Sequence, residues 1–216
     1  LDSFHSGNLI YSACVLWGDI WFFLIGVPHR NSYEEPLSRE ACIFVSNHVS
    51  YFDIPVIVKT FRKPVRPLGK AEMTKVPVFG YIYKNAIVTV ARSSSADRAR
   101  SVKLLKSTLQ KGISVLVFPE GTFNQTGHPL KEFYDGAFRI AIETGAPIRP
   151  VLMLDTYDRL HPRSIFSATP GRSRSIFLAS IPTAGLSLAD LDELKQRVID
   201  EMSRKLRAYG ASWINE

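Results

Sequence analysis

Two short apolar runs, each followed abruptly by polar residues, constrain the fold of this chain most strongly. The first run covers residues 43–46 and leads directly into Asn47 and His48. The second covers residues 113–118 and leads into a polar turn that contains Glu120. Continuous apolar runs of this length are typical of parallel strands that are buried on both faces. Because ligands bind at the carboxyl ends of strands in open α/β sheets, the two polar clusters are predicted to face one crevice.

Predicted strands and helices alternate along most of the chain. This order favours an α/β fold with a mostly parallel central sheet, flanked by helices and joined by right-handed crossovers. A chain of 216 residues with 45% hydrophobic content can bury one substantial core, so we assign residues 41–216 to one domain and residues 1–40 to an N-terminal apolar helix and linker. The predicted strands cover residues 41–46, 64–70, 86–91, 113–118, 148–154 and 175–181. The predicted helices cover residues 52–60, 77–84, 95–111 and 133–144. A last helix is predicted to begin near Ser187, which forms a capping box with Asp190.

The N-terminal region contains a nearly uncharged stretch, residues 9–27, with two tryptophans and one charge, Asp19. About 19 helical residues are long enough to cross the apolar core of a bilayer or nearly so. The stretch lacks the basic start and the small-residue cleavage pattern of a signal peptide. Asp19 and Gly18 argue against simple spanning, and the tryptophans favour the interfacial zone, so we expect a membrane-associated helix. A spanning helix, an interfacial helix and an ordinary buried helix all stay open. Because the chain begins at Leu1, we expect the natural start to lie upstream.

The chain is basic, with 27 Lys and Arg residues against 20 Asp and Glu residues. Such an excess suits nucleic acid, anionic lipid or phosphorylated substrates. No arginine-rich arm, zinc-finger spacing or RNA-binding aromatic signature is present, so a nucleic-acid partner is not expected. The two cysteines, Cys14 and Cys42, lie in apolar runs and suggest neither a disulfide framework nor a metal site. We therefore expect a reducing compartment.

His48 and Asp53 form a candidate pair for acid–base chemistry. Histidine is the side chain best suited to act as a base near neutral pH, and a carboxylate bound to its far nitrogen fixes the tautomer. Residues five apart lie roughly 140° round a regular helix, so the two can meet only if His48 precedes the helix and Asp53 lies in its first turn. Pro55 supports this placement, because proline is tolerated in a first turn. Taken alone, the pair also fits a capping aspartate beside a turn histidine. No second pair of metal ligands follows at a recognisable spacing, so no metal site is expected.

The two motifs together resemble the glycerolipid acyltransferase family, which comprises the lysophosphatidic acid acyltransferases and their relatives. The family's Asn-His pair, followed after four residues by Asp, matches at Asn47, His48 and Asp53. Its Phe-Pro-Glu-Gly-Thr-Arg motif matches at residues 118–122 and then departs, because Phe123 stands where the family usually has an arginine thought to hold the acceptor's phosphate. Two looser motifs also match, one at Lys70, Pro77, Phe79, Gly80 and Arg92 and the other at residues 146–151. The whole resemblance runs from about residue 41 to residue 184.

The resemblance implies a direct acyl transfer. His48 would remove the proton from the acceptor's free hydroxyl as that oxygen attacks an acyl thioester, and Asp53 would orient the imidazole. No Gly-x-Ser-x-Gly elbow is present, and the mechanism needs none. Glu120 would either bind the acceptor's glycerol or tie its own loop. The expected substrate-binding residues are Asn47, which helps to shape the turn, Lys70 and Arg92, which would hold the phosphate, and Glu120, Gly121 and Thr122, near an oxyanion hole.

The resemblance therefore implies an O-acyltransferase domain bound to the cytoplasmic face of a membrane. The expected acceptor is a lysophospholipid, 1-acyl-sn-glycerol 3-phosphate in the first place, which would give phosphatidic acid. The expected donor is acyl-CoA or an acyl carrier protein thioester, acting as a co-substrate, and no cofactor is needed.

Three alternatives stay open. Phe123 in place of the arginine leaves room for a different lysolipid acceptor. The apolar helix and basic surface would suffice for a non-enzymatic membrane-binding domain, which has no need of the His48–Asp53 pair. A metal-dependent hydrolase of lipid esters is the third, and it would lose activity to a chelator.

Overall fold

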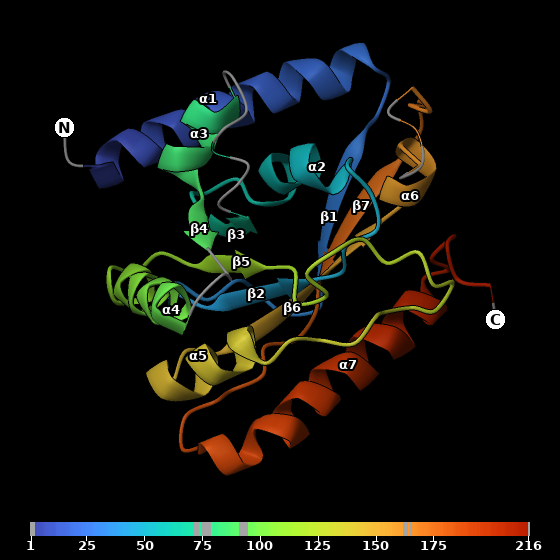
Figure 1. Ribbon diagram of the computed structural model, residues 1–216. Coiled ribbons are helices and arrows are strands. Elements are labelled where there is room, and N and C mark those ends of the chain that lie inside the picture. Colours follow the sequence, from blue (N-terminus) through green and yellow to red (C-terminus); the bar gives the residue numbers. More distant parts are fainter. Residues whose placement is uncertain are drawn as a thin grey trace.

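A single twisted sheet forms the centre of the molecule (Figure 1). The computed structural model describes residues 3–70, 74, 79–90, 95–161, 164 and 166–215. Within these residues seven strands pair in the order β1-β7-β6-β2-β5-β3-β4. The strands are β1 (His29–Tyr33), β2 (Ile43–Ser46), β3 (Arg66–Lys70), β4 (Val88–Val90), β5 (Val115–Val117), β6 (Ile148–Leu154) and β7 (Ser173–Phe177).

Five neighbouring strands, from β6 through β2, β5 and β3 to β4, run parallel to one another. The mostly parallel sheet that the sequence predicts is therefore confirmed. The exception is at one side, where β7 runs antiparallel to β6 and β1 runs parallel to β7. Since the five parallel strands share one direction, their carboxyl ends lie at the same edge of the sheet.

The side of the sheet with β7 and β1 differs most from the sequence prediction. The strand expected at residues 175–181 begins and ends earlier, at Ser173–Phe177, and Ile181 forms only an isolated bridge with Ile148. β1 was not predicted, because its residues, His-Arg-Asn-Ser-Tyr, contain no apolar run and lie mostly exposed. The expected linker before residue 41 thus contains an edge strand.

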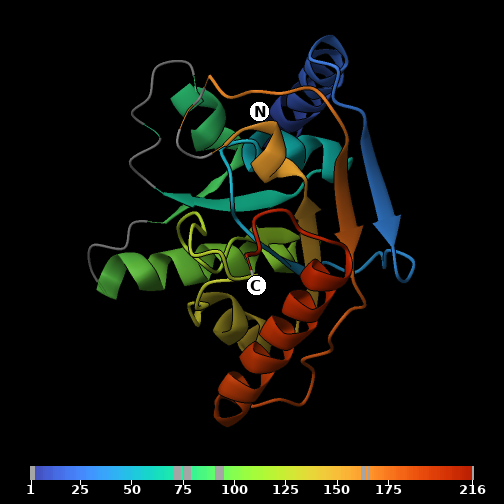
Figure 2. The same cartoon turned by 90° about the vertical axis from the view of Figure 1, so that its right-hand side faces the viewer.

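Helices cover both faces of the sheet. In Figure 1 and in the perpendicular view of Figure 2, α1, α2 and α3 lie on one side, and α4, α5 and α7 lie on the other. The capping box of Ser187 and Asp190 is present and starts a short 3₁₀ turn, Leu188–Asp190, that continues into the last helix. The helices are α1 (Ser3–Leu24), α2 (Asp53–Thr60), α3 (Phe79–Ala86), α4 (Ser95–Gln110), α5 (Gly136–Thr144), α6 (Thr156–Arg159) and α7 (Leu191–Ala208).

The alternation of side chains along β2 explains why two separate cores form. Ile43 and Val45 point into the larger core, which also contains Leu105 of α4, Phe138 of α5 and apolar residues of α7. Phe44 points the other way, into a second core beneath α1 and α2. Successive strand residues face opposite sides of a sheet, so a strand buried on both faces needs apolar residues at every position.

Helix α1 packs along α2 by one face. Asp19 accepts hydrogen bonds from both guanidinium nitrogens of Arg62, at 2.8 and 2.7 Å, and one from Lys59 Nζ at 2.5 Å. These cations hold the pKa of Asp19 well below its ordinary value, mainly through the Arg62 contact. The Tyr11 hydroxyl donates to the backbone oxygen of Phe61 at 2.9 Å. The only charge of the apolar stretch is therefore paired with cations of the domain.

The other face of α1 is uncovered. Only 22% of its apolar segment, Gly7–Leu24, is buried, so α1 is not an ordinary buried helix. By length and composition this helix is able to cross a membrane, but here it lies against α2 and α3 (Figure 1). Its exposed apolar side chains are Leu9, Leu16, Trp17, Ile20, Phe23 and Leu24.

Gly18 sets the distance between α1 and α2, since a Cβ atom at this position would lie 2.7 Å from Cγ2 of Val58. We expect Gly18→Leu to push the helices apart and to lower the free energy of unfolding by about 1–3 kcal/mol, as overpacked cores do. Gly136→Leu is the matched control, because a Cβ atom on Gly136 of α5 meets nothing within 4 Å. Denaturant unfolding in detergent measures both variants, and equal stabilities would contradict this role for Gly18.

Candidate active site

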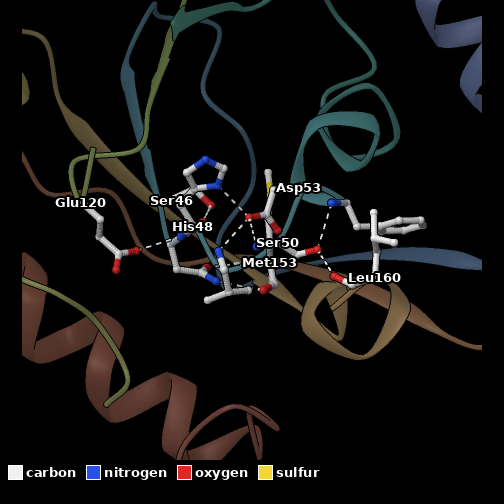
Figure 3. A network of polar contacts seen from close by, with 10 residues as sticks. Ser46, His48, Ser50, Asp53, Glu120, Met153 and Leu160 are labelled. Atoms are coloured by element: carbon white, nitrogen blue, oxygen red, sulfur yellow. Dashed lines mark hydrogen bonds and ion pairs between the residues drawn. The ribbon is translucent and has the colours of Figure 1, made fainter. Parts of the chain in front are cut away.

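The candidate site lies where the carboxyl ends of three adjacent strands meet. His48 follows β2, Glu120 follows β5, and Met153 lies near the end of β6, while β2 pairs with both of its neighbours. Figure 3 shows these residues converging with Asp53 in one network of polar contacts. The prediction that the two polar motifs face one crevice agrees with this arrangement.

His48 and Asp53 are in direct contact. His48 Nδ1 lies 2.7 Å from Asp53 Oδ2, and the Asp53 side chain is fully buried while the His48 side chain is 15% exposed. A carboxylate only accepts hydrogen bonds, so Nδ1 donates to Asp53, and in the neutral imidazole Nε2 is the nitrogen with the free lone pair. Figure 3 shows Nε2 directed away from Asp53. The imidazole is thus held in the tautomer that a general base requires.

The turn before α2 explains how residues five apart come together. The same Asp53 oxygen accepts the backbone N–H groups of Val49, at 2.8 Å, and Ser50, at 3.0 Å. The Ser50 hydroxyl in turn accepts the N–H of Phe52 and donates to the backbone oxygen of Leu160, next to α6. Asp53 is the first residue of α2 and His48 precedes the helix, as predicted.

Glu120 holds the backbone of the candidate base. Its Oε1 accepts the backbone N–H of His48 at 2.8 Å, and its Oε2 accepts that of Lys131 at 2.9 Å. The carbonyl of His48 accepts the N–H of Asn124 at 2.7 Å. Of the two roles expected for Glu120, tying its own loop is the one that these contacts match. Burial raises the pKa of Glu120 to about 7, although the two N–H donors oppose the shift.

Asn47 belongs to the frame of the site. Its amide nitrogen donates to the backbone oxygen of Met153 at 3.0 Å, and its amide oxygen accepts the N–H of Met153 at 2.8 Å. The side chain therefore continues the β2–β6 ladder after β2 itself has turned away. Asn47 is completely buried, so in this structure its contacts shape the turn and do not line the crevice.

Aromatic rings enclose the imidazole. Phe118 stacks on His48 with a centroid distance of 4.2 Å, and Phe123 meets the same ring edge-on at 4.4 Å. Tyr51 packs against Phe123 at 4.6 Å. These contacts restrict the rotation of His48 and exclude water from its faces. Sequence reasoning did not place Phe118 or Tyr51 in the site, although both lie inside or beside the motifs that it used.

The turn after β5 offers two backbone donors. Gly121 has φ of +69°, a conformation that glycine adopts without strain, and its N–H donates to the oxygen of Phe118 at 3.1 Å. The N–H groups of Thr122 and Phe123 have no acceptor in the described part of the chain. The Thr122 hydroxyl accepts a hydrogen bond from Lys131 Nζ at 2.6 Å. Among the residues expected near an oxyanion hole, Thr122 therefore has a free N–H and Gly121 does not.

The two residues expected to bind phosphate are only partly located. Lys70 is the last residue of β3 and pairs in register with Val90 of β4. Arg92 and Pro77 lie outside the described residues. Phe79 and Gly80 begin α3.

Comparisons with known proteins agree with the geometry. A family model described as acyltransferase matches residues 29–154, and the chain belongs to this family. It is 32% identical to the chloroplastic 1-acyl-sn-glycerol-3-phosphate acyltransferase BAT2 of Brassica napus over 56% of this chain and 35% of that protein. It is 28% identical to the lyso-ornithine lipid O-acyltransferase of Pseudomonas aeruginosa over 79% of this chain and 70% of that protein.

A solved structure shares the fold. The crystal structure of the 1-acyl-sn-glycerophosphate (LPA) acyltransferase PlsC from Thermotoga maritima superimposes with a TM-score of 0.74 at 27% identity, over 94% of this chain and 80% of that one. The chain spans only about a third of the Brassica napus relative and 46% of the similar acyltransferase of Cocos nucifera.

The contacts of Glu120 predict a pH-dependent loss of stability. In Glu120→Gln the amide NH₂ group cannot accept an N–H, so either His48 or Lys131 loses its acceptor, and we expect a loss of about 1–3 kcal/mol at pH 5. Because the folded protein raises the pKa of Glu120 to about 7, wild-type stability should fall as the pH rises through 7. The difference in unfolding free energy between wild type and Glu120→Gln should then become smaller towards pH 8. Denaturant unfolding at both pH values measures it, with Glu132→Gln in the same loop as control. A difference in stability that stays the same at both pH values would mean that Glu120 is already ionised at pH 5.

Proposed function

We propose that this protein transfers an acyl chain from a thioester donor to the free hydroxyl of a lysophospholipid. The acceptor is 1-acyl-sn-glycerol 3-phosphate and the product is phosphatidic acid. The observation that carries the proposal is the contact of 2.7 Å between His48 Nδ1 and Asp53 Oδ2, which leaves Nε2 of the imidazole directed away from the carboxylate (Figure 3). A non-enzymatic membrane-binding domain has no need of this arrangement.

The reaction proceeds in one displacement through a tetrahedral intermediate. His48 Nε2 takes the proton of the acceptor hydroxyl while its oxygen attacks the thioester carbonyl. Asp53 stabilises the imidazolium that forms, as the aspartate of a catalytic triad does. Collapse of the intermediate breaks the carbon–sulfur bond, and the imidazolium returns its proton to the departing thiolate. The free N–H groups of Thr122 and Phe123, in the loop beside His48, are the donors proposed for the oxyanion.

The side chains near His48 favour direct transfer over an acyl-enzyme. The hydroxyls of Ser46 and Ser50 donate to the backbone oxygens of Asn47 and Leu160, so both are already engaged. The buried Cys42 thiol is a poor nucleophile, because burial raises its pKa to about 11.

An apolar cavity of about 580 Å³ lies between α1, α2 and α3 and supports an acyl-chain site. Its walls include Ile10, Cys14 and Trp17 of α1 and Ile54 and Val58 of α2. Ile54, which lines the cavity, is the residue after Asp53 at the start of α2. Its volume falls within the range of about 300–1,000 Å³ that small-molecule sites occupy.

The exposed face of α1 supports attachment to a membrane. Phe23 is 85% exposed and lies among other exposed apolar side chains of α1. An apolar face of this kind is more stable against lipid than in water. The net charge of +7 favours an anionic lipid surface. We propose attachment at the cytoplasmic face, where acyl-CoA or an acyl carrier protein thioester, the proposed donors, would be available. The reaction as proposed needs no cofactor.

One observation favours a second acceptor. Phe123 packs against the candidate base and brings no charge to the place where the family usually has an arginine. The relative from Pseudomonas aeruginosa is named for a lyso-ornithine lipid, which is not a phosphomonoester. A lysolipid without phosphate is therefore the alternative acceptor.

His48→Ala should lower kcat about 10²–10⁴-fold while the protein stays folded, because this is the usual contribution of general-base catalysis. Asp53→Asn should also lose activity, since its amide cannot hold the imidazole in the same way. The measurement is thiol release from an acyl thioester with lysophosphatidic acid as acceptor, with His128→Ala as a control in an exposed loop. Near-normal turnover by a folded His48→Ala protein would contradict the mechanism.

A chelator should leave the wild-type rate unchanged, whereas a metal-dependent hydrolase would lose its activity.

Replacing Leu9, Phe23 and Leu24 of α1 together by Ser should weaken binding to anionic vesicles by roughly tenfold or more, since each buried apolar side chain is worth about 1.5–3 kcal/mol. Leu104 of α4 and Leu188 are also exposed, and their replacement by Ser is the control. Vesicle co-sedimentation measures the change. If the triple variant binds as tightly as wild type, attachment lies elsewhere on the surface.

A further inference from the structure

We propose that Lys131 supplies the cation that binds the acceptor's phosphate, in place of the arginine that the family resemblance places at position 123. The inference rests on the proposed function, because it concerns the acceptor of that reaction. Lys131 lies outside every motif that the sequence pointed to, and no comparison assigns it a role.

The position of Lys131 is fixed by the same carboxylate that fixes His48. Its backbone N–H donates to Oε2 of Glu120 at 2.9 Å, while Oε1 of Glu120 accepts the N–H of His48 at 2.8 Å. The side chain of Lys131 then runs over the turn after β5, where Nζ donates to Thr122 Oγ1 at 2.6 Å. Thr122 is the neighbour of Phe123, whose ring touches the imidazole. The backbone of Lys131 is thus held by Glu120 and its ammonium group by Thr122, on the turn whose next residue touches the imidazole.

Lys131 differs in its pairing from four other lysines of the chain. Lys59, Lys106, Lys195 and Lys205 each form an ion pair with a carboxylate. Lys131 forms none within the described residues, and both oxygens of its neighbour Glu120 already accept backbone N–H groups. An ammonium group has three hydrogen-bond donors, and Thr122 takes one, so two remain for an anion.

The chemistry of the acceptor brings its phosphate to this place. In 1-acyl-sn-glycerol 3-phosphate the reacting hydroxyl and the phosphate ester are on adjacent carbon atoms. When the hydroxyl lies at His48 Nε2, the phosphate must therefore lie close to the rings and the turn around it. Phe123 cannot bind an anion, whereas Lys131 and the hydroxyl hydrogen of Thr122 can both donate to one.

Lysine and arginine bind phosphate differently, which gives the inference a consequence for selectivity. A guanidinium holds a phosphate through two parallel hydrogen bonds, whereas an ammonium acts as a compact point charge on a flexible stem. The site should therefore accept a phosphomonoester with looser geometry than an arginine would impose. The same charge could also meet a phosphate of the thioester donor, so the experiment has to separate the two substrates.

The test compares Lys131→Ala and Lys131→Arg with Lys103→Ala, an exposed lysine of α4, as control. Initial rates are measured in mixed micelles while lysophosphatidic acid and the acyl thioester are varied in turn. Lys131→Ala should raise the KM for lysophosphatidic acid about ten- to a hundredfold and leave the KM for the thioester unchanged, because a hydrogen bond to a charged group is lost. Lys131→Arg should restore most of the affinity, which a merely structural role would not explain. Thr122→Val should have a smaller effect in the same direction.

Calorimetric titration of the whole protein with lysophosphatidic acid, without donor, makes the result independent of turnover. Equal binding by wild type and Lys131→Ala overturns the inference, as does a KM increase for the thioester alone, which would assign Lys131 to the donor. A wild-type protein that binds lysophosphatidic acid through Lys131 but acylates no lysolipid would overturn the proposed function and leave this inference standing. A wild-type protein that neither binds nor acylates lysophosphatidic acid overturns both the proposed acceptor and the inference.

Discussion

The candidate site depends on one buried oxygen atom, Oδ2 of Asp53. It accepts the Nδ1–H of His48 and the backbone N–H groups of Val49 and Ser50, so it fixes the base and the turn that carries the base at once. Asp53 is also the first residue of α2, where the helix dipole favours a negative charge. Loss of this carboxylate would remove the group that fixes the His48 tautomer, the contacts that hold the turn and the negative charge at the start of α2. One contact between two side chains therefore stabilises a site to which three strands contribute residues.

The sequence predicted the elements that carry their own pattern. β6, whose seven residues are all buried, was predicted with its observed bounds, and the polar residues that follow β2 and β5 meet at one edge of the sheet, as predicted. The separation of His48 and Asp53 was informative because it excludes one helix face and leaves only a turn followed by a first helical turn. The motif residues could be recognised because their identity follows from their chemistry. The division of the chain at residue 40 and the role of each site residue stay predictions.

The features that could not be predicted from the sequence depend on contacts between distant segments. β1 has no apolar run, because an edge strand needs only one paired neighbour, so nothing in its residues distinguishes it from a loop. Lys131 is as hydrophilic as any surface lysine, and only the return of its loop to Glu120 gives it a position. Asn47 was expected to shape the turn, but its partner there, the backbone of Met153, is one that folding alone supplies. Such pairings have no periodicity that a single sequence could display.

The two oxygens of Glu120 close a loop, and closure has a consequence for how this enzyme family can diversify. His48 and Asn124 are fixed on one side of the loop and Lys131 on the other, so residues 125–130 connect two anchored ends. Lengthening a closed flexible loop adds little entropy cost, about 0.6 kcal/mol for each doubling of its length. The oxygens of Gly127 and Pro129 accept hydrogen bonds from Asn215 and Trp213, so changes that keep these contacts are the ones that the loop can accommodate. For the proposed reaction, such changes can alter the surroundings of the acceptor while the imidazole keeps its place. If the reaction is the one proposed, head-group preference and acyl transfer can therefore change separately in evolution, because only the Glu120 carboxylate links the two parts.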